Sequence, residues 1–121
     1  MTLAALASLN AHAVLVIYQR GPDTDELYDS KLISRDASTI KLWTLTSFAK
    51  PMTTLEGKDY QSEKMLTTID CSLRKIGVEQ VVRLTGRHGQ GETVSLMDSP
   101  LRLMAIRPGS PDERLLEKFC R

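Results

Sequence analysis

The two cysteines of this chain constrain its fold more than any other feature of the sequence. Cys120 ends a short helix-like segment, whereas Cys71 follows a run of strand-forming residues. Two cysteines roughly fifty residues apart fit one disulfide that joins a terminal helix to a sheet. A single bridge leaves no reactive thiol and is typical of an exported protein; two buried thiols are the alternative.

The segment 110–120 carries the signals of a short helix. Ser110 is the expected N-cap, Pro111 takes the first helical position, and Glu113 completes a capping box. Apolar side chains then recur on one helical face, at Leu115, Leu116, Phe119 and Cys120. We expect this face to cover the apolar side of a sheet and to bring Cys120 close to Cys71.

Most of the preceding chain is predicted to form short strands, because runs of β-branched and aromatic residues alternate with turn residues. The expected strands cover residues 14–18, 26–28, 39–48, 60–69, 75–85, 92–97 and 101–106. The strand at residues 39–48 is expected to end at Lys50-Pro51, because proline cannot donate a backbone hydrogen bond to a neighbouring strand. The sequence predicts an α+β domain in which a single antiparallel sheet of about six strands carries one C-terminal helix.

A turn at residues 70–74 sets the expected pairing of the two strands that flank it. It places Ile69 opposite Ile76, with the next pairs being Thr67 with Val78 and Met65 with Gln80. Side chains alternate with period two, so the residues expected on the face of Ile69 and Cys71 are Ile76, Val78, Val82 and Leu84.

Residues 1–13 differ from the rest of the chain. They are small and apolar and end in Ala11-His12-Ala13, an A-x-A pattern of the kind that signal peptidase cleaves. The apolar stretch is short and follows no Lys or Arg, so an ordinary apolar segment is the alternative. We expect a signal peptide at residues 1–13 and one domain at residues 14–121. No run reaches the roughly 18 apolar residues of a membrane span.

The sequence offers little for catalysis or for a cofactor. A net charge of +1 gives no electrostatic case for nucleic acid. His88 lies in the Gly-rich turn 86–91, which lacks the lysine and hydroxyl of a phosphate loop. Asp23, Asp25 and Glu26 lack the spacing of a calcium-binding EF-hand. We therefore expect no catalytic residue, no metal site, no cofactor and no enzyme activity.

Two further features concern packing and surface charge. Trp43, the sole tryptophan, is expected to anchor the core rather than to form a binding surface. The C-terminal half also holds Arg83, Arg87, Arg102 and Arg107. We expect these arginines to be scattered over the surface; a gathering of them against an acidic partner is the alternative.

An ordered set of residues along the chain resembles one known family. Its members are Tyr28-Asp29-Ser30, Ile33, Arg35-Asp36, Leu42-Trp43-Thr44-Leu45, Lys50-Pro51, Tyr60-Gln61-Ser62, Asp70-Cys71-Ser72-Leu73-Arg74, Gly91-Glu92-Thr93-Val94, Pro108-Gly109-Ser110 and Phe119-Cys120. Together they resemble the surface-adhesin protein E family of Gram-negative bacteria over residues 14–121. The resemblance implies an exported protein whose curved antiparallel sheet carries a C-terminal helix held by a disulfide.

The resemblance also implies a function and a location. Named adhesins of the family bind host extracellular-matrix and serum proteins such as vitronectin, laminin and plasminogen, and they can dimerise. They are lipoproteins, whereas this chain shows no lipobox, so we expect a periplasmic or secreted protein, or one at the cell surface. We expect a non-catalytic protein-binding domain. A periplasmic structural or envelope-stress protein and a small-ligand-binding module are the alternatives.

Overall fold

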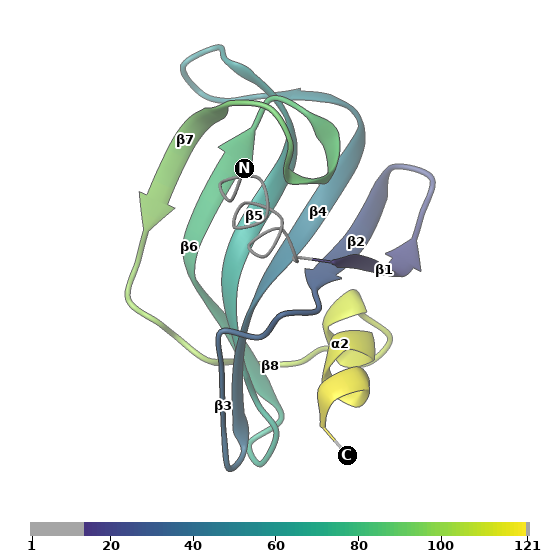
Figure 1. Cartoon of the computed structure of the whole chain (residues 1–121), viewed down its shortest axis with the longest axis vertical. Coiled ribbons are helices and arrows are strands. Elements are labelled where there is room, and N and C mark those ends of the chain that lie inside the picture. The colour runs from purple at the N-terminus through teal and green to yellow at the C-terminus, as the bar shows by residue number, and fades with distance from the viewer. Residues whose placement is uncertain (1–13, 121) are drawn as a thin grey trace, which may run out of the picture.

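Antiparallel strands make up most of residues 14–120, the part of the chain that the computed structural model describes (Figure 1). The strands are β1 (Leu15–Arg20), β2 (Thr24–Asp29), β3 (Ser34–Asp36), β4 (Thr39–Thr53), β5 (Asp59–Asp70), β6 (Lys75–Leu84), β7 (Thr93–Asp98) and β8 (Met104–Ala105). A 3-10 turn, η1 (Arg87–Gly89), precedes β7, and helix α2 (Pro111–Phe119) follows β8. The predicted antiparallel sheet with a C-terminal helix is confirmed. The predicted signal peptide at residues 1–13 lies outside the described residues.

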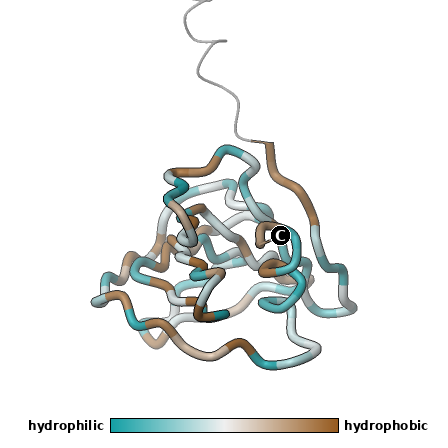
Figure 2. The backbone as a smooth tube through the Cα atoms, turned by 90° about the horizontal axis from the view of Figure 1, so that it is seen from below, coloured by the Kyte–Doolittle hydropathy of each residue, from teal (hydrophilic) through white to brown (hydrophobic). Residues whose placement is uncertain are grey.

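The sheet is a meander that curves around the helix. Its strand order is β1-β2-β4-β5-β6-β7, with β3 added beside β4 and β8 beside β6. Seen from below, the C-terminal helix lies within the outline of the surrounding chain (Figure 2). We call the side of the sheet that carries α2 the concave face.

The main core lies between the concave face and α2. Period-two alternation places Ile40 and Leu42 of β4 on this face, opposite Ile69 and Thr67 of β5. The buried core consists of Tyr28, Ile40, Leu42, Ile69, Ile76, Leu115 and Leu116. Full burial of one such aliphatic side chain stabilises a fold by about 1.5–3 kcal/mol. The apolar stripe of α2 therefore supplies a large part of the packing free energy.

The opposite face of the sheet is covered by the turn between β6 and β7. The hydroxyls of Ser47 and Ser62 are fully buried and accept hydrogen bonds from the backbone N–H groups of His88 and Gly89, at 3.1 and 2.9 Å. Gly89 has φ of +76°, and a Cβ on it would lie 2.8 Å from Leu45 Cδ2. The turn approaches the sheet this closely because the residue there is glycine.

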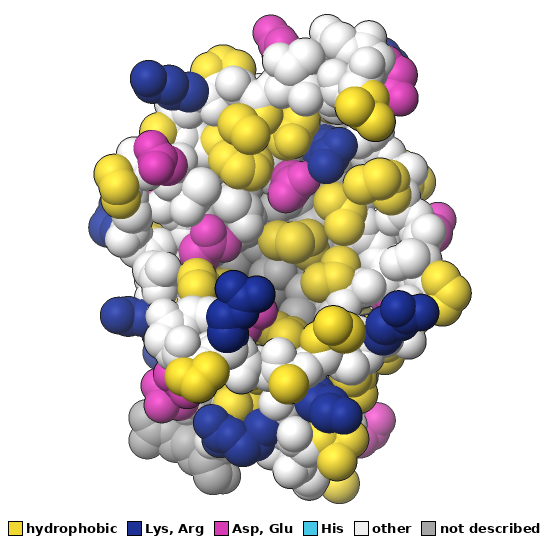
Figure 3. Space-filling view, turned by 180° about the vertical axis from the view of Figure 1, so that it is seen from behind, with side chains coloured by type: hydrophobic (Ala, Val, Ile, Leu, Met, Phe, Trp, Pro, Cys, Tyr) yellow, Lys and Arg dark blue, Asp and Glu magenta, His cyan; other side chains and the backbone are white. Residues whose placement is uncertain are grey.

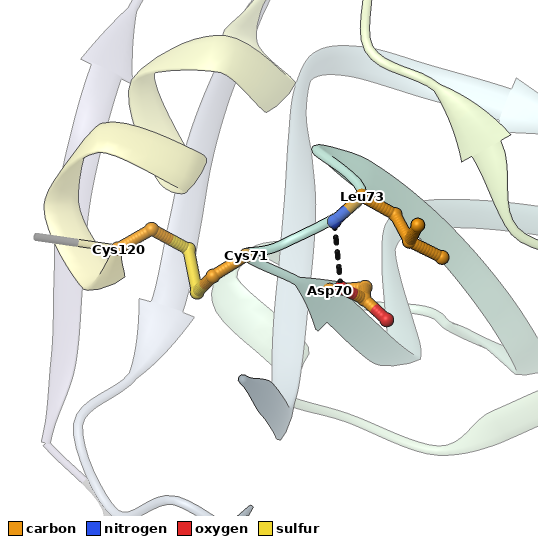
Figure 4. The surroundings of a disulfide bond; sticks show 4 residues. All are labelled: Asp70, Cys71, Leu73 and Cys120. Atoms are coloured by element: carbon orange, nitrogen blue, oxygen red, sulfur yellow. Dashed lines mark hydrogen bonds between the residues drawn. A yellow bond between two sulfur atoms is a disulfide. The ribbon is translucent and has the colours of Figure 1, made fainter. Parts of the chain in front are cut away.

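Both ends of α2 are fixed. Ser110 is the N-cap, and its Oγ accepts from the Glu113 N–H at 3.3 Å. The Glu113 carboxylate accepts from the Gly109 N–H at 2.9 Å, one residue before the cap residue that a capping box uses. At the other end, Cys120 is bonded to Cys71, with 5.4 Å between their Cα atoms (Figure 4). The disulfide predicted from the sequence is present.

The turn that carries Cys71 is itself ordered by a hydrogen bond. The Asp70 carboxylate accepts from the Leu73 N–H at 2.9 Å (Figure 4). The Cys71 N–H donates to the Ser38 carbonyl at 2.7 Å, which ties the turn to the loop before β4. The sulfur of Cys71 is therefore held in place by two neighbouring parts of the sheet.

The prediction that the strand ends at Pro51 is wrong, because β4 continues to Thr53. The β4–β5 register shifts between the pairs Ser47–Ser62 and Met52–Tyr60, so Pro51 lies in an irregular stretch without regular pairing. Its missing N–H costs no ladder bond there. The Gln61 side-chain amide donates to the carbonyl of Phe48 at 3.1 Å and so satisfies part of this stretch.

The expected β5–β6 register holds only near the turn. Ile69 pairs with Ile76 and Thr67 with Val78 as predicted, but Met65 pairs with Val81 instead of Gln80. A β-bulge leaves Glu79 as an extra residue, which reverses the alternation along the rest of β6. The prediction that Val82 and Leu84 share the face of Ile69 is therefore wrong, because Val81 and Arg83 take those positions.

Two short strands also differ from the expectation. Residues 101–106 pair only at Met104–Ala105, opposite Ile76 and Lys75 of β6. Ser34–Asp36, for which no strand is predicted, pairs with the start of β4. All of its residues are exposed, so no apolar alternation marks it in the sequence.

Removal of the disulfide should destabilise this fold strongly. We expect the Cys71→Ala/Cys120→Ala double variant to lose about 4 kcal/mol of unfolding free energy, because the bridge restricts a long loop in the unfolded chain. Chemical denaturation followed by circular dichroism measures the loss. The wild-type chain with its disulfide reduced should match the double variant. An unchanged denaturation midpoint in both samples contradicts the prediction.

Candidate functional site

A cleft of about 590 Å³ lies on the concave face, beside the N-terminal end of α2. Its floor is formed by β2, β4, β5 and β6, and its rim by residues 102–105 and the first turn of the helix. The molecule is hollowed on this side, and hydrophobic and acidic side chains both border the hollow (Figure 3). This volume falls within the range of small-molecule sites.

Glu26 of β2 is held rigidly in the cleft. Its two carboxylate oxygens accept from the hydroxyls of Thr46 at 2.7 Å and Thr24 at 3.1 Å. Register explains the first contact, because Glu26 and Thr46 are direct cross-strand partners and share a face. The carboxylate is therefore oriented by the sheet.

Tyr18 and Asp112 complete the polar end of the cleft. Burial raises the pKa of the Tyr18 phenol above its ordinary value, and the negative charges of Glu26 and Asp112 raise this pKa further. Burial also raises the pKa of the Asp112 carboxyl. Asp112 is nevertheless exposed on one side.

The rest of the floor combines apolar and polar side chains. Met65 and Val78 line it, together with a pair of buried threonines, Thr44 and Thr67, and Met104 belongs to the rim. The threonine hydroxyls lie 2.8 Å apart and share a hydrogen bond. Their polar atoms are therefore satisfied without a ligand.

The close approach of residues 101–105 to β6 forms one wall of the cleft. A Cβ on Gly77 would lie 2.5 Å from the Arg102 carbonyl oxygen. Any other residue at position 77 would push this segment outward. Glycine at position 77 therefore permits the close approach of this segment to β6.

A second feature lies at the edge of the sheet. β7 is the last strand in the order, so its outer edge has no partner strand within residues 14–120. Leu96 and Met97 of β7 are 58% and 46% exposed. Leu101 and Met104, farther along the same side of β6, are 41% and 59% exposed. We call these four side chains, with the outer edge of β7, the β7 edge.

Trp43 does not join the main core, contrary to the prediction. It lies in β4 beside Leu42, so alternation turns it to the face opposite α2, where it is partly exposed. Lys64 Nζ lies 4.6 Å above its ring centroid, a cation–π distance. A shallow pocket there is lined by Trp43, Lys64 and His88.

The Gly-rich turn at 86–91 packs against the sheet and is only partly exposed at its centre. His88 has φ of +56° and is only partly exposed, and its Nε2 atom is buried without a hydrogen-bond partner among the described residues. The backbone of the turn packs on the sheet through Ser47 and Ser62, so this segment closes one face of the fold.

The structure separates the other polar residues that the sequence singles out. Asp25 pairs with Arg87 at 3.7 Å, Arg83 pairs with Glu63 at 2.9 Å, and Glu26 lies in the cleft. Arg102 lines the cleft. Residues 14–120 contain no group of three or more His, Cys, Asp or Glu side chains that could hold a metal ion.

Sequence reasoning missed the cleft and did not bring together the three side chains at its polar end. Tyr18, Glu26 and Asp112 come from β1, β2 and α2, and no short motif joins them. The sequence marks Glu26 only within an acidic loop. Asp112 lies in the first turn of a capped helix, where an acidic residue is common for another reason.

Comparison with known proteins gives one match. The family described as surface-adhesin protein E matches residues 17–121 of this chain. Neither a curated protein nor a solved structure matches the chain significantly. The matched region contains both cysteines, the cleft and the β7 edge.

The raised pKa of Tyr18 should make stability fall at alkaline pH. Below about pH 10 the phenol is neutral in both states, whereas above it the unfolded chain ionises first and unfolding becomes easier. Relative to Tyr18→Phe, the wild-type free energy of unfolding should therefore fall by at most about 1.4 kcal/mol per pH unit. Urea denaturation of both proteins at about pH 8 and about pH 11 tests this. An equal difference at both pH values refutes it.

Proposed function

Because the chain belongs to the surface-adhesin protein E family, we propose that it is an exported, non-catalytic protein that binds a host protein through its β7 edge. The observation that carries this proposal is the combination of an open strand edge with exposed apolar side chains. The proposed partners are the extracellular-matrix and serum proteins that the family resemblance implies.

An open edge strand can receive a strand from another protein. Unpaired backbone N–H and C=O groups of β7 can bond to an extended segment of a partner, and side-chain pockets then provide specificity. Leu96 and Met97 point to opposite faces of the sheet, because neighbouring side chains alternate. An added strand would therefore bury apolar surface on both faces.

The same edge suits a second copy of the chain, so we propose that homodimerisation and partner binding use the same surface. Natural edge strands are commonly protected by charged or proline residues. Within β7 only Asp98, at its end, is charged. A single charged residue at one end leaves the middle of the strand unprotected.

The family indicates an exported or cell-surface protein. No helix within residues 14–120 combines the length and the apolar character needed to cross a membrane. We propose the periplasm or outer surface of a Gram-negative bacterium as the location. The disulfide supports this proposal, because such bonds persist in oxidising compartments.

A charge in the middle of the edge should weaken binding. We expect Leu96→Lys to weaken binding to immobilised vitronectin or laminin by about tenfold or more, because a central apolar contact is replaced by a charge that must be desolvated. Surface plasmon resonance at moderate salt measures the affinity. Leu73→Lys is a matched control, because Leu73 is 59% exposed but lies in the β5–β6 turn.

Each outcome of this experiment has a clear meaning. Equal loss in both variants shows a general effect of charge and contradicts a β7-edge interface. No binding of the wild-type protein to any matrix or serum protein contradicts host adhesion and favours the structural or envelope-stress role.

A further inference from the structure

We propose that the cleft beside α2 is a binding site for a small organic cation, an amine or guanidinium group carried on an apolar stem. This site shares Met104 with the β7 edge, but its carboxylates lie outside that edge, and the inference does not depend on the adhesion proposal. Three features of the cleft carry it: carboxylates without an ion-pair partner, the fixed orientation of one of them, and apolar side chains beside them.

The first feature is negative charge without a protein counter-ion. The ion pairs within residues 14–120 are Lys41–Glu79, Arg83–Glu63 and Arg87–Asp25. Neither Glu26 nor Asp112 takes part in them, so no described cation lies within 4.0 Å of either carboxylate. Both line the same cleft. A recess with low-dielectric walls strengthens their attraction for a cation.

The second feature is preorganisation. Glu26 keeps its position through the hydroxyls of Thr46 and Thr24, one to each oxygen. Each carboxylate oxygen has a further lone pair available, so a cation can add a charge-assisted hydrogen bond without displacing these donors. Because the acceptor is already ordered, a ligand loses little side-chain entropy on binding.

The third feature is the surface beside these carboxylates. Met65, Val78 and Met104 provide apolar contact for an aliphatic or aromatic stem. Methionine side chains adapt to ligands of different shape. Tyr18, which is partly buried against the core, adds a further ring surface at this end of the cleft.

Arg102 also lines the cleft, so a variant at this position tests whether the ligand is positively or negatively charged. Its side chain is exposed and forms no ion pair within the described residues. If the ligand is a cation, Arg102 repels it, and Arg102→Gln should strengthen binding. If the ligand is an anion, the same variant should weaken binding.

The test is a titration of the ¹⁵N-labelled, disulfide-bonded protein with three probes of the same length. Hexylamine, hexanol and hexanoate carry a positive, a neutral and a negative head group. We expect saturable shifts of cleft amides with hexylamine, at least about tenfold weaker binding of hexanol, and no binding of hexanoate. Equal binding of hexanol and hexylamine overturns the proposal, as do shifts that map outside the cleft.

Matched variants identify the carboxylates. We expect Glu26→Gln to weaken hexylamine binding by about tenfold and Asp112→Asn to weaken it by a smaller factor, because Asp112 is partly hydrated. Glu117→Gln removes an exposed charge farther along α2 and should change nothing. If Glu26→Gln disturbs folding, Asp112→Asn still tests the site. Unchanged affinity in both cleft variants overturns the proposal.

Two further samples separate this site from adhesion and identify the source of the cation. Leu96→Lys should bind hexylamine like the wild type, so loss of adhesion and loss of cation binding are distinguishable. A capped Gly-Lys-Gly peptide carries the same head group on a protein chain. Tighter binding of this peptide than of hexylamine indicates that the natural ligand is a lysine side chain of a partner protein, and the reverse order indicates a free amine. Either order supports the site. Failure of both probes to bind overturns it.

Discussion

The bond between Cys71 and Cys120 fixes the end of α2 beside the β5–β6 turn, and the position of the helix then determines what the concave face can bury. Leu115 and Leu116 cover the lower half of that face and complete the core. The helix has nine residues and is roughly 14 Å long, whereas the fifteen residues of β4 can extend over roughly 50 Å. So short a helix leaves part of the face uncovered, and the cleft occupies the part next to its N-terminal end.

The local features of this arrangement could be predicted from the sequence because each depends on nearby residues. The Ser110 cap needs only Glu113 three positions later, and the pairing of Ile69 with Ile76 follows from a short turn. The partnership of Cys71 and Cys120 required no geometry, because the chain offers no other cysteine. The strand-rich segments were also recognisable by their β-branched and aromatic residues.

The features that failed prediction depend on distant parts of the chain. Pro51 is tolerated within β4 because the β4–β5 register shifts there and its missing N–H costs no ladder bond, and no local pattern reveals this. The prediction that Trp43 joins the main core is wrong because both faces of this sheet are covered, so a large apolar residue can pack on either face. The cleft could not be predicted from the sequence for a similar reason, because Tyr18, Glu26 and Asp112 come together only when β1, β2 and α2 assemble.

The extra residue at Glu79 reverses which side chains of β6 face the helix on the two sides of the bulge. Below it, the even-numbered Ile76 and Val78 face the helix side; above it, the odd-numbered Val81 and Arg83 do. A homologous chain shorter by one residue at this point would present Val82 and Leu84 there instead, and the Arg83–Glu63 pair would be lost. A change of one residue in chain length, with almost the same composition, would thus place the apolar Leu84 on the concave face instead of the charged Arg83. Relatives with the same fold can therefore differ in the chemistry of their concave faces through chain length alone.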